Sequence, residues 1–162
     1  MADRRGNVIV LPGRGGAAQV QRDHLEALQA IVGQLDELRH RLQEFSPHPG
    51  WPAKRWMIAS TPFRMRLTGS NRSLGDLTRL NASSGQDAIR SVFQLNDACR
   101  AASQRLHDIE ACLGMLQSAE PPPAERARET DLFASNRSGL LAALSEIRRL
   151  IVQRFPDVQV EN

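Results

Sequence analysis

The sequence predicts an all-α protein: an antiparallel helical hairpin, a coiled coil or a small helical bundle of three long helices with an irregular basic insert. Three observations support this class. Apolar residues recur at spacings of three and four in three long segments, and prolines follow each of these segments. Aromatic residues make up only 4% of the 162 residues, and tyrosine is absent. Aliphatic side chains must therefore fill the core, which suits helix-on-helix packing better than a β-sandwich.

A single helical domain is expected over residues 19–156, and its first long helix is expected over 18–45. Residues 1–18 hold several glycines and arginines and are expected to form a flexible basic arm. After them, the helical spacing of apolar residues continues until Pro47 and Pro49, which cannot extend a helix. The apolar stripe of this helix consists of Leu28, Ile31, Leu35, Leu38, Leu42 and Phe45.

Residues 46–82 interrupt the helical pattern and are expected to form the irregular insert. Prolines and a glycine at the start of this range predict a loop. Phe63, Met65 and Leu67 then alternate with arginines, which is typical of a short strand or an extended segment. The run at 69–71 (Gly-Ser-Asn) predicts a turn, and the leucines after it allow one or two helical turns.

The most regular heptad pattern predicts a second helix over 84–117. Ser83 and Gln86 have the spacing of a capping box, and the prolines at 121–123 end the pattern. An apolar stripe this narrow needs a partner helix to cover it. Its members are Val92, Leu95, Cys99, Ala102, Leu106, Ile109, Leu113 and Leu116.

A linker over 118–129 is expected to lead into a third helix over 130–155, which ends at Pro156. The residues after it, 157–162, are expected to form a frayed tail. Whether this third helix packs on its own chain or on a neighbouring chain stays open. Its apolar stripe consists of Phe133, Leu140, Leu144, Ile147 and Ile151.

The two cysteines indicate a reducing compartment. Cys99 and Cys112 lie on the same predicted helix, where a rise of 1.5 Å per residue separates them by about 20 Å. A disulfide cannot span that distance. The chain also has no apolar run long enough to span a membrane, and its N-terminal apolar stretch is too short for a signal peptide. We therefore expect a cytoplasmic protein.

The motifs of the common enzyme classes do not occur in the sequence. It contains no phosphate-binding loop, no nucleophile elbow, no zinc-protease motif and no pair of cysteines with two residues between them. Its four histidines include no pair at the helical spacing that a metal site requires. We therefore expect no catalytic residues, no metal and no cofactor, and the sequence predicts that the protein is not an enzyme.

The insert is the strongest candidate for recognition, because residues 51–80 hold six basic residues against one acid. Its cations could neutralise phosphates or pair with an acidic protein, and its aromatic rings could stack on bases or anchor an interface. Alternatively, residues such as Trp56, Met57, Ile58, Phe63 and Met65 pack under the bundle while the arginines stay in water. The candidate binding residues are Trp51, Lys54, Arg55, Trp56, Phe63, Arg64, Arg66 and Arg72.

These observations favour a non-enzymatic, cytoplasmic regulator or adaptor of bacterial type that acts by helix-mediated protein–protein association. The stripes of the first two helices form the expected association seam, and a homodimer is expected because a narrow seam is buried better across a second chain. The alternative is a nucleic-acid-binding protein that uses the basic insert together with the N-terminal arm. No membrane partner is expected.

Overall fold

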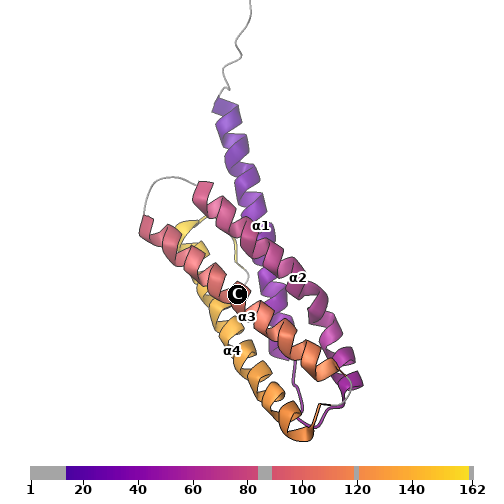
Figure 1. The fold of residues 1–162 in the computed structure, drawn as a ribbon. Helices are drawn as coiled ribbons and strands as arrows, with labels where there is room; N and C mark the ends of the chain where they lie inside the picture. The colour runs from indigo at the N-terminus through magenta and orange to yellow at the C-terminus, as the bar shows by residue number, and fades with distance from the viewer. Residues whose placement is uncertain (1–13, 84–88, 119–120, 161–162) are drawn as a thin grey trace, which may run out of the picture.

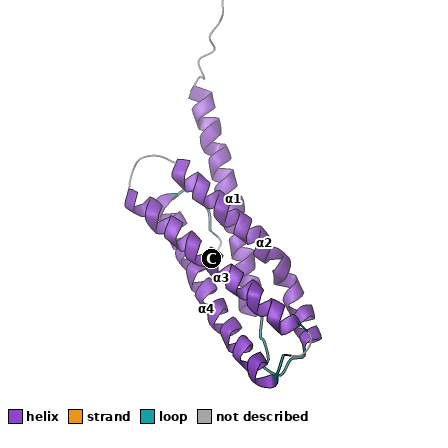
Figure 2. Cartoon of the chain, in the orientation of Figure 1, coloured by secondary structure: helices purple, strands orange, loops and turns teal. Residues whose placement is uncertain are grey.

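The protein is described by a computed structural model that covers residues 14–83, 89–118 and 121–160. Within these ranges the chain forms helices and contains no strand (Figure 2). The all-helical class is confirmed, whereas the expected number of three helices is wrong, since most of the expected insert is itself a long helix. The four helices are α1 (Arg14–Glu44), α2 (Ala53–Ser83), α3 (Ile89–Gln117) and α4 (Pro123–Arg154).

Successive helices run in alternating directions and lie side by side (Figure 1). Each helix packs against its neighbour in the sequence, and α4 returns to α1, while the diagonal pairs of described helices do not approach each other closely. The N-terminal end of α1 extends beyond the other helices (Figure 1), and its Val20 is exposed. None of the described helices is both long enough and apolar enough to cross a membrane.

The helix α2 corrects the expectation of an irregular insert. All its buried positions except Ser73 are spaced by four and three in turn, but polar residues occupy several of them. Phe63 and Leu67 face the core whereas Met65 faces solvent, so their alternation reflects a helix rather than a strand. The expected turn at 69–71 also lies inside α2. The buried positions are Trp56, Ser60, Phe63, Leu67, Ser70, Ser73, Leu74, Leu77 and Asn81.

The apolar stripes expected for the other three segments form the core of the protein. All their members are buried except Val92, which is half-buried. They are covered by helices of the same chain, and α4 packs on α3 of its own chain. These stripes therefore do not need a second chain to cover them. A homodimer stays a prediction, and it would have to use other surfaces.

The element boundaries differ from the expected ones in three places. α1 already begins at Arg14, inside the expected arm, while residues 1–13 lie outside the described ranges. α4 begins at Pro123, inside the expected linker, because proline is well tolerated in the first turn of a helix. The expected tail is not frayed over 157–160, since Val158 is buried in the core. The capping box expected at Ser83 and Gln86 falls partly outside the described residues.

An aromatic cluster closes the end of the bundle where α1 leads into α2 and α3 leads into α4. Phe45 lies at its centre, with ring centroids 4.9 Å from Phe63, 5.5 Å from Phe133 and 5.8 Å from Trp51. Trp56 completes the cluster. These pairs are edge-on or tilted, the geometry that adds about 0.5–1.5 kcal/mol per pair beyond area burial. Five of the seven aromatic residues of the chain are thus used for packing.

We predict that Leu106→Ala lowers the free energy of unfolding by about 2–5 kcal/mol. The Leu106 side chain is fully enclosed, so its truncation leaves a cavity in the core. Met65→Ala is the matched control, and we expect a change of no more than about 0.5 kcal/mol there, since Met65 is exposed. Urea denaturation followed by circular dichroism measures both values. Equal losses in the two variants would contradict the assignment of the core.

Candidate partner-binding face

The structure separates the candidate binding residues into two groups. Trp56 and Phe63 are enclosed in the aromatic cluster. They cannot stack on a base or reach a partner from that position, which corrects the expectation for these two residues. The other six candidates lie at the surface, with Trp51 and Arg66 partly covered; they are Trp51, Lys54, Arg55, Arg64, Arg66 and Arg72.

The outward side of α2 carries a row of exposed apolar residues. Ile58, Pro62 and Met65 follow one another at spacings of four and three, which places them on one side of the helix. Ile58 is 61% exposed and Met65 is 81% exposed. Met57 is exposed beside them. The expectation that Met57, Ile58 and Met65 pack under the bundle is therefore wrong, although it holds for Trp56 and Phe63.

Two open hollows lie along this row and meet at Ile58. The larger hollow has a volume of about 620 Å³ and is lined by Ile58, Thr61, Pro62, Met65 and Arg66. The smaller hollow has a volume of about 480 Å³ and is lined by Trp51, Pro52, Lys54, Arg55, Ile58 and Ala59. Both walls are mainly apolar, and both hollows lack a carboxylate among their lining residues. They offer a shallow apolar surface rather than an enclosed pocket.

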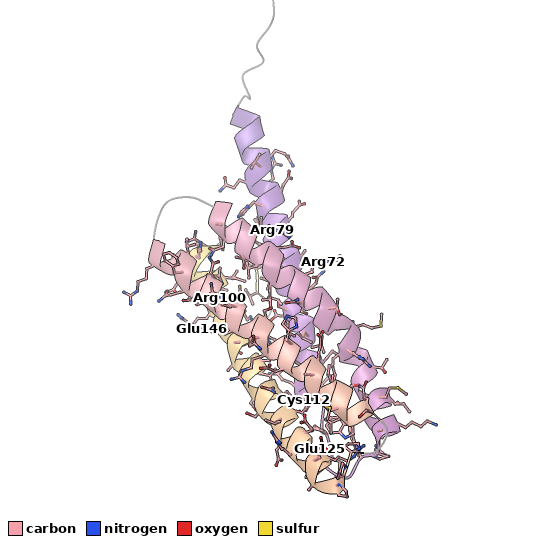
Figure 3. All side chains as sticks on the ribbon, viewed as in Figure 1. Arg72, Arg79, Arg100, Cys112, Glu125 and Glu146 are labelled. Carbon is pink, nitrogen blue, oxygen red and sulfur yellow. The ribbon has the colours of Figure 1, made fainter. Side chains whose placement is uncertain are left out.

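Cations surround the row. No acidic residue occurs in α2 between its start and Asp76. The guanidinium of Arg55 lies 5.1 Å from the centre of the Trp51 ring, and Arg64 donates a hydrogen bond of 2.6 Å to Gln117. Arg66 is the exception, because an ion pair of 2.5 Å with Glu37 of α1 neutralises it in part. Figure 3 shows Arg72 further along the same helix.

We call this surface the α2 outer face. Its apolar row was missed by reasoning from the sequence, although a signal was present. Had α2 been recognised as a helix, its heptad through Trp56 and Phe63 would have placed the row on the opposite side. The face consists of Trp51, Lys54, Arg55, Ile58, Pro62, Arg64, Met65, Arg66 and Arg72.

The cysteines do not offer reactive groups. Cys99 and Cys112 are free and buried, and Figure 3 shows Cys112 on α3. Burial raises the pKa of the Cys99 thiol to about 11, and burial together with the charge of Glu129 raises the pKa of Cys112. A nucleophilic thiol requires the opposite shift. Among the described residues, no three His, Cys, Asp or Glu side chains are grouped so that they could hold a metal ion.

We predict that the protein loses stability between pH 9 and pH 11. In this window the thiol of the unfolded chain releases its proton, while folded Cys99 keeps it up to about pH 11. The unfolded state therefore gains free energy of ionisation as the pH rises. A difference of two pKa units corresponds to about 2.7 kcal/mol.

Urea denaturation across this pH range measures the loss. Cys99→Ala should remove the part that Cys99 contributes, and the raised pKa of Cys112 leaves a further loss of the same sign. Few other groups obscure the window, because the chain has no tyrosine and Lys54 is its single lysine. A wild-type free energy of unfolding that stays constant up to pH 11 would contradict the burial of this thiol.

Comparisons with protein-family models, with curated proteins and with solved structures found no match to this chain.

Proposed function

We propose that the protein is a non-enzymatic adaptor or regulator that binds another protein through the α2 outer face. The supporting observation is the row of Ile58, Pro62 and Met65, which is exposed and surrounded by basic side chains. A contiguous apolar patch rimmed by polar residues is typical of a surface that a partner covers. Tryptophan and arginine, which border the row at Trp51 and Arg55, are the residue types that contribute most at interfaces.

The chemistry of the face favours an acidic amphipathic helix as the partner. A row spaced by four and three forms a ridge against which apolar residues of a second helix can pack. Carboxylates on the flanks of such a helix would meet Lys54, Arg55, Arg64 and Arg72. Complementary charge of this kind accelerates association and excludes basic partners.

Nucleic acid is the second candidate, and the exposed cations support it. The aromatic rings that would stack on bases do not support this candidate, because two of the three expected aromatic residues are enclosed. The third, Trp51, is partly covered and has the guanidinium of Arg55 over its ring. Phosphate contacts alone would produce binding without sequence preference and with a steep dependence on salt.

We predict that a fluorescent synthetic peptide, with leucines at helical spacing and glutamates on its flanks, binds the wild-type protein. Ile58→Asp should weaken this binding by about tenfold or more, because it places a charge in the apolar row. A tenfold change in affinity corresponds to about 1.4 kcal/mol. Phe93→Asp is the matched control, since Phe93 of α3 is also 61% exposed. Fluorescence anisotropy measures both affinities. Equal weakening in both variants would overturn the assignment of the face.

A second experiment distinguishes the protein partner from nucleic acid. We predict that Arg55→Glu and Arg72→Glu weaken peptide binding, whereas Arg100→Glu on α3 does not, since Arg100 lies outside the face and is highly exposed. A labelled DNA duplex and a single strand are titrated in parallel at low and at physiological salt. The nucleic-acid function would be favoured instead if the wild-type protein binds DNA but not the peptide. In that case DNA binding should weaken steeply with salt, and it should be lost when Arg55, Arg64 and Arg66 are changed to Ala.

A further inference from the structure

The seam between α1 and α4 is the most sparsely packed of the four seams in the bundle. A void of about 10 Å³ remains in it, which is close to the smallest that admits one water molecule. Val32 and Leu35 of α1 line this void on one side, and Leu144, Ile147 and Ile151 of α4 line it on the other. Side chains around a void lose part of their attractive contacts. The ion pair of Asp36 with Arg148, at 3.9 Å, also crosses this seam, so few apolar contacts and this one pair have to separate if α1 leaves α4.

The chain after α4 crosses this side of the molecule. Phe155 ends the helix by donating its N–H to the Ile151 carbonyl at 2.7 Å, and Val158 turns back onto the Phe155 carbonyl at 3.1 Å. The chain then runs back toward the middle of the bundle (Figure 1). Val158 is only 5% exposed and belongs to the core, and Val160 packs against it.

Two hydrogen bonds join this segment to α1. The Gln29 side chain donates from Nε2 to the Gln159 carbonyl at 2.6 Å, and its Oε1 accepts the Gln159 N–H at 3.0 Å. The side-chain amide thus pairs with the backbone as a neighbouring strand would. The Phe155 ring also lies 5.9 Å from the His24 ring of α1. These contacts all reach the N-terminal half of α1.

The other end of the segment is anchored on the rest of the bundle. Arg154, the last residue of α4, donates to the Ser91 hydroxyl at 2.9 Å and to the Asn81 carbonyl at 3.3 Å. Its guanidinium lies 5.5 Å from the centre of the Phe155 ring. The segment therefore starts from a fixed point on α2 and α3 and reaches across to α1.

The C-terminal end of α1 is held by different contacts. Phe45 is the centre of the aromatic cluster, and Arg137 of α4 donates a hydrogen bond to its carbonyl. α1 is thus held at one end by the cluster, and further toward its N-terminus it is contacted both by the segment after α4 and by α2, whose Ser73 donates a hydrogen bond to Gln34.

We propose that residues 155–160 act as a strap that holds the N-terminal half of α1 on the bundle. When the strap is released, this half of α1 opens about the aromatic cluster while α2, α3 and α4 stay folded. Opening exposes the apolar stripe of α1 from Leu28 to Leu35. A partner that captures the strap, or a protease that removes it, would in this way control the exposure of that stripe.

Amide hydrogen exchange of the full-length chain, followed by mass spectrometry, tests the strap. Val158→Asp should accelerate exchange of α1 amides over 25–38 by about tenfold to a hundredfold, the change in an equilibrium constant that burial of a valine supports. Exchange in α3 around Leu106 should change by no more than about twofold. Leu132→Asp, which is exposed on α4 near the opposite end of that helix from the strap, is the matched control and should leave α1 unchanged.

Gln29→Ala tests the same strap without disturbing the core, and its control is Gln43→Ala, which is exposed on the same helix. We expect about threefold to tenfold faster exchange over 25–38 from the loss of the two hydrogen bonds. This variant decides the question if Val158→Asp does not fold. Unchanged exchange in α1, or equal acceleration of α1 and α3, would overturn the proposal.

Discussion

The architecture depends on the burial of four narrow apolar stripes against one another. Isolated helices of this kind are marginal in water, so each helix needs the others to cover its stripe. The stripes of α1, α3 and α4 are mainly aliphatic, whereas α2 contributes buried polar positions such as Ser60, Ser70 and Asn81. Two of these polar groups pair with α3, since Gln117 donates to Ser60 at 2.8 Å and Asn81 donates to Asn96 at 3.1 Å.

A third pair lies between these two, where Ser103 of α3 donates to Asn71 of α2 at 2.7 Å. As the α2 partner advances along the chain, the α3 partner retreats, which is what an antiparallel helix pair requires. Buried polar groups lose free energy if they lack a partner, so a shift of one helix along the other would be penalised at all three pairs. Apolar stripes alone tolerate such shifts better. The polar residues of α2 therefore select one register from several that the stripes allow.

The same polar residues explain which parts of the fold could be predicted from the sequence. The stripes of α1, α3 and α4 consist of residues such as Leu106 and Leu140, whose spacing shows directly which side is buried. In α2, serines and an asparagine occupy heptad positions, and Pro62 lies inside the helix, so the pattern was not recognised. The prediction of the candidate site is wrong in part for the same reason. Without a helix, Trp56 could not be assigned to the core, nor Ile58 to the surface.

Arginines of α4 also contribute in a way that the sequence does not reveal. Arg137 donates to the Phe45 carbonyl just after α1, and Arg154 donates to the Asn81 carbonyl in the last turn of α2. Arg126 donates to the Leu116 carbonyl in the last turn of α3 at 3.5 Å and to the Trp51 carbonyl at 2.8 Å. Carbonyls at a helix C-terminus lack donors and carry negative charge, so cations stabilise them. The helix α4 thus caps the C-terminal ends of all three other helices.

These caps give the two ends of the bundle different properties. At the end with the aromatic cluster, Arg126 and Arg137 bind the chain between α1 and α2, and the α2 outer face begins within this chain, at Trp51. A partner that docks there would meet a surface already fixed in shape, so little of its binding free energy would be spent on ordering the protein. At the opposite end α1 extends past its neighbours, and Gln29 ties it to the strap. Docking on α2 and opening of α1 therefore share one contact, the ion pair of Arg66 with Glu37, because Arg66 belongs to the α2 outer face and Glu37 lies in the part of α1 that opens.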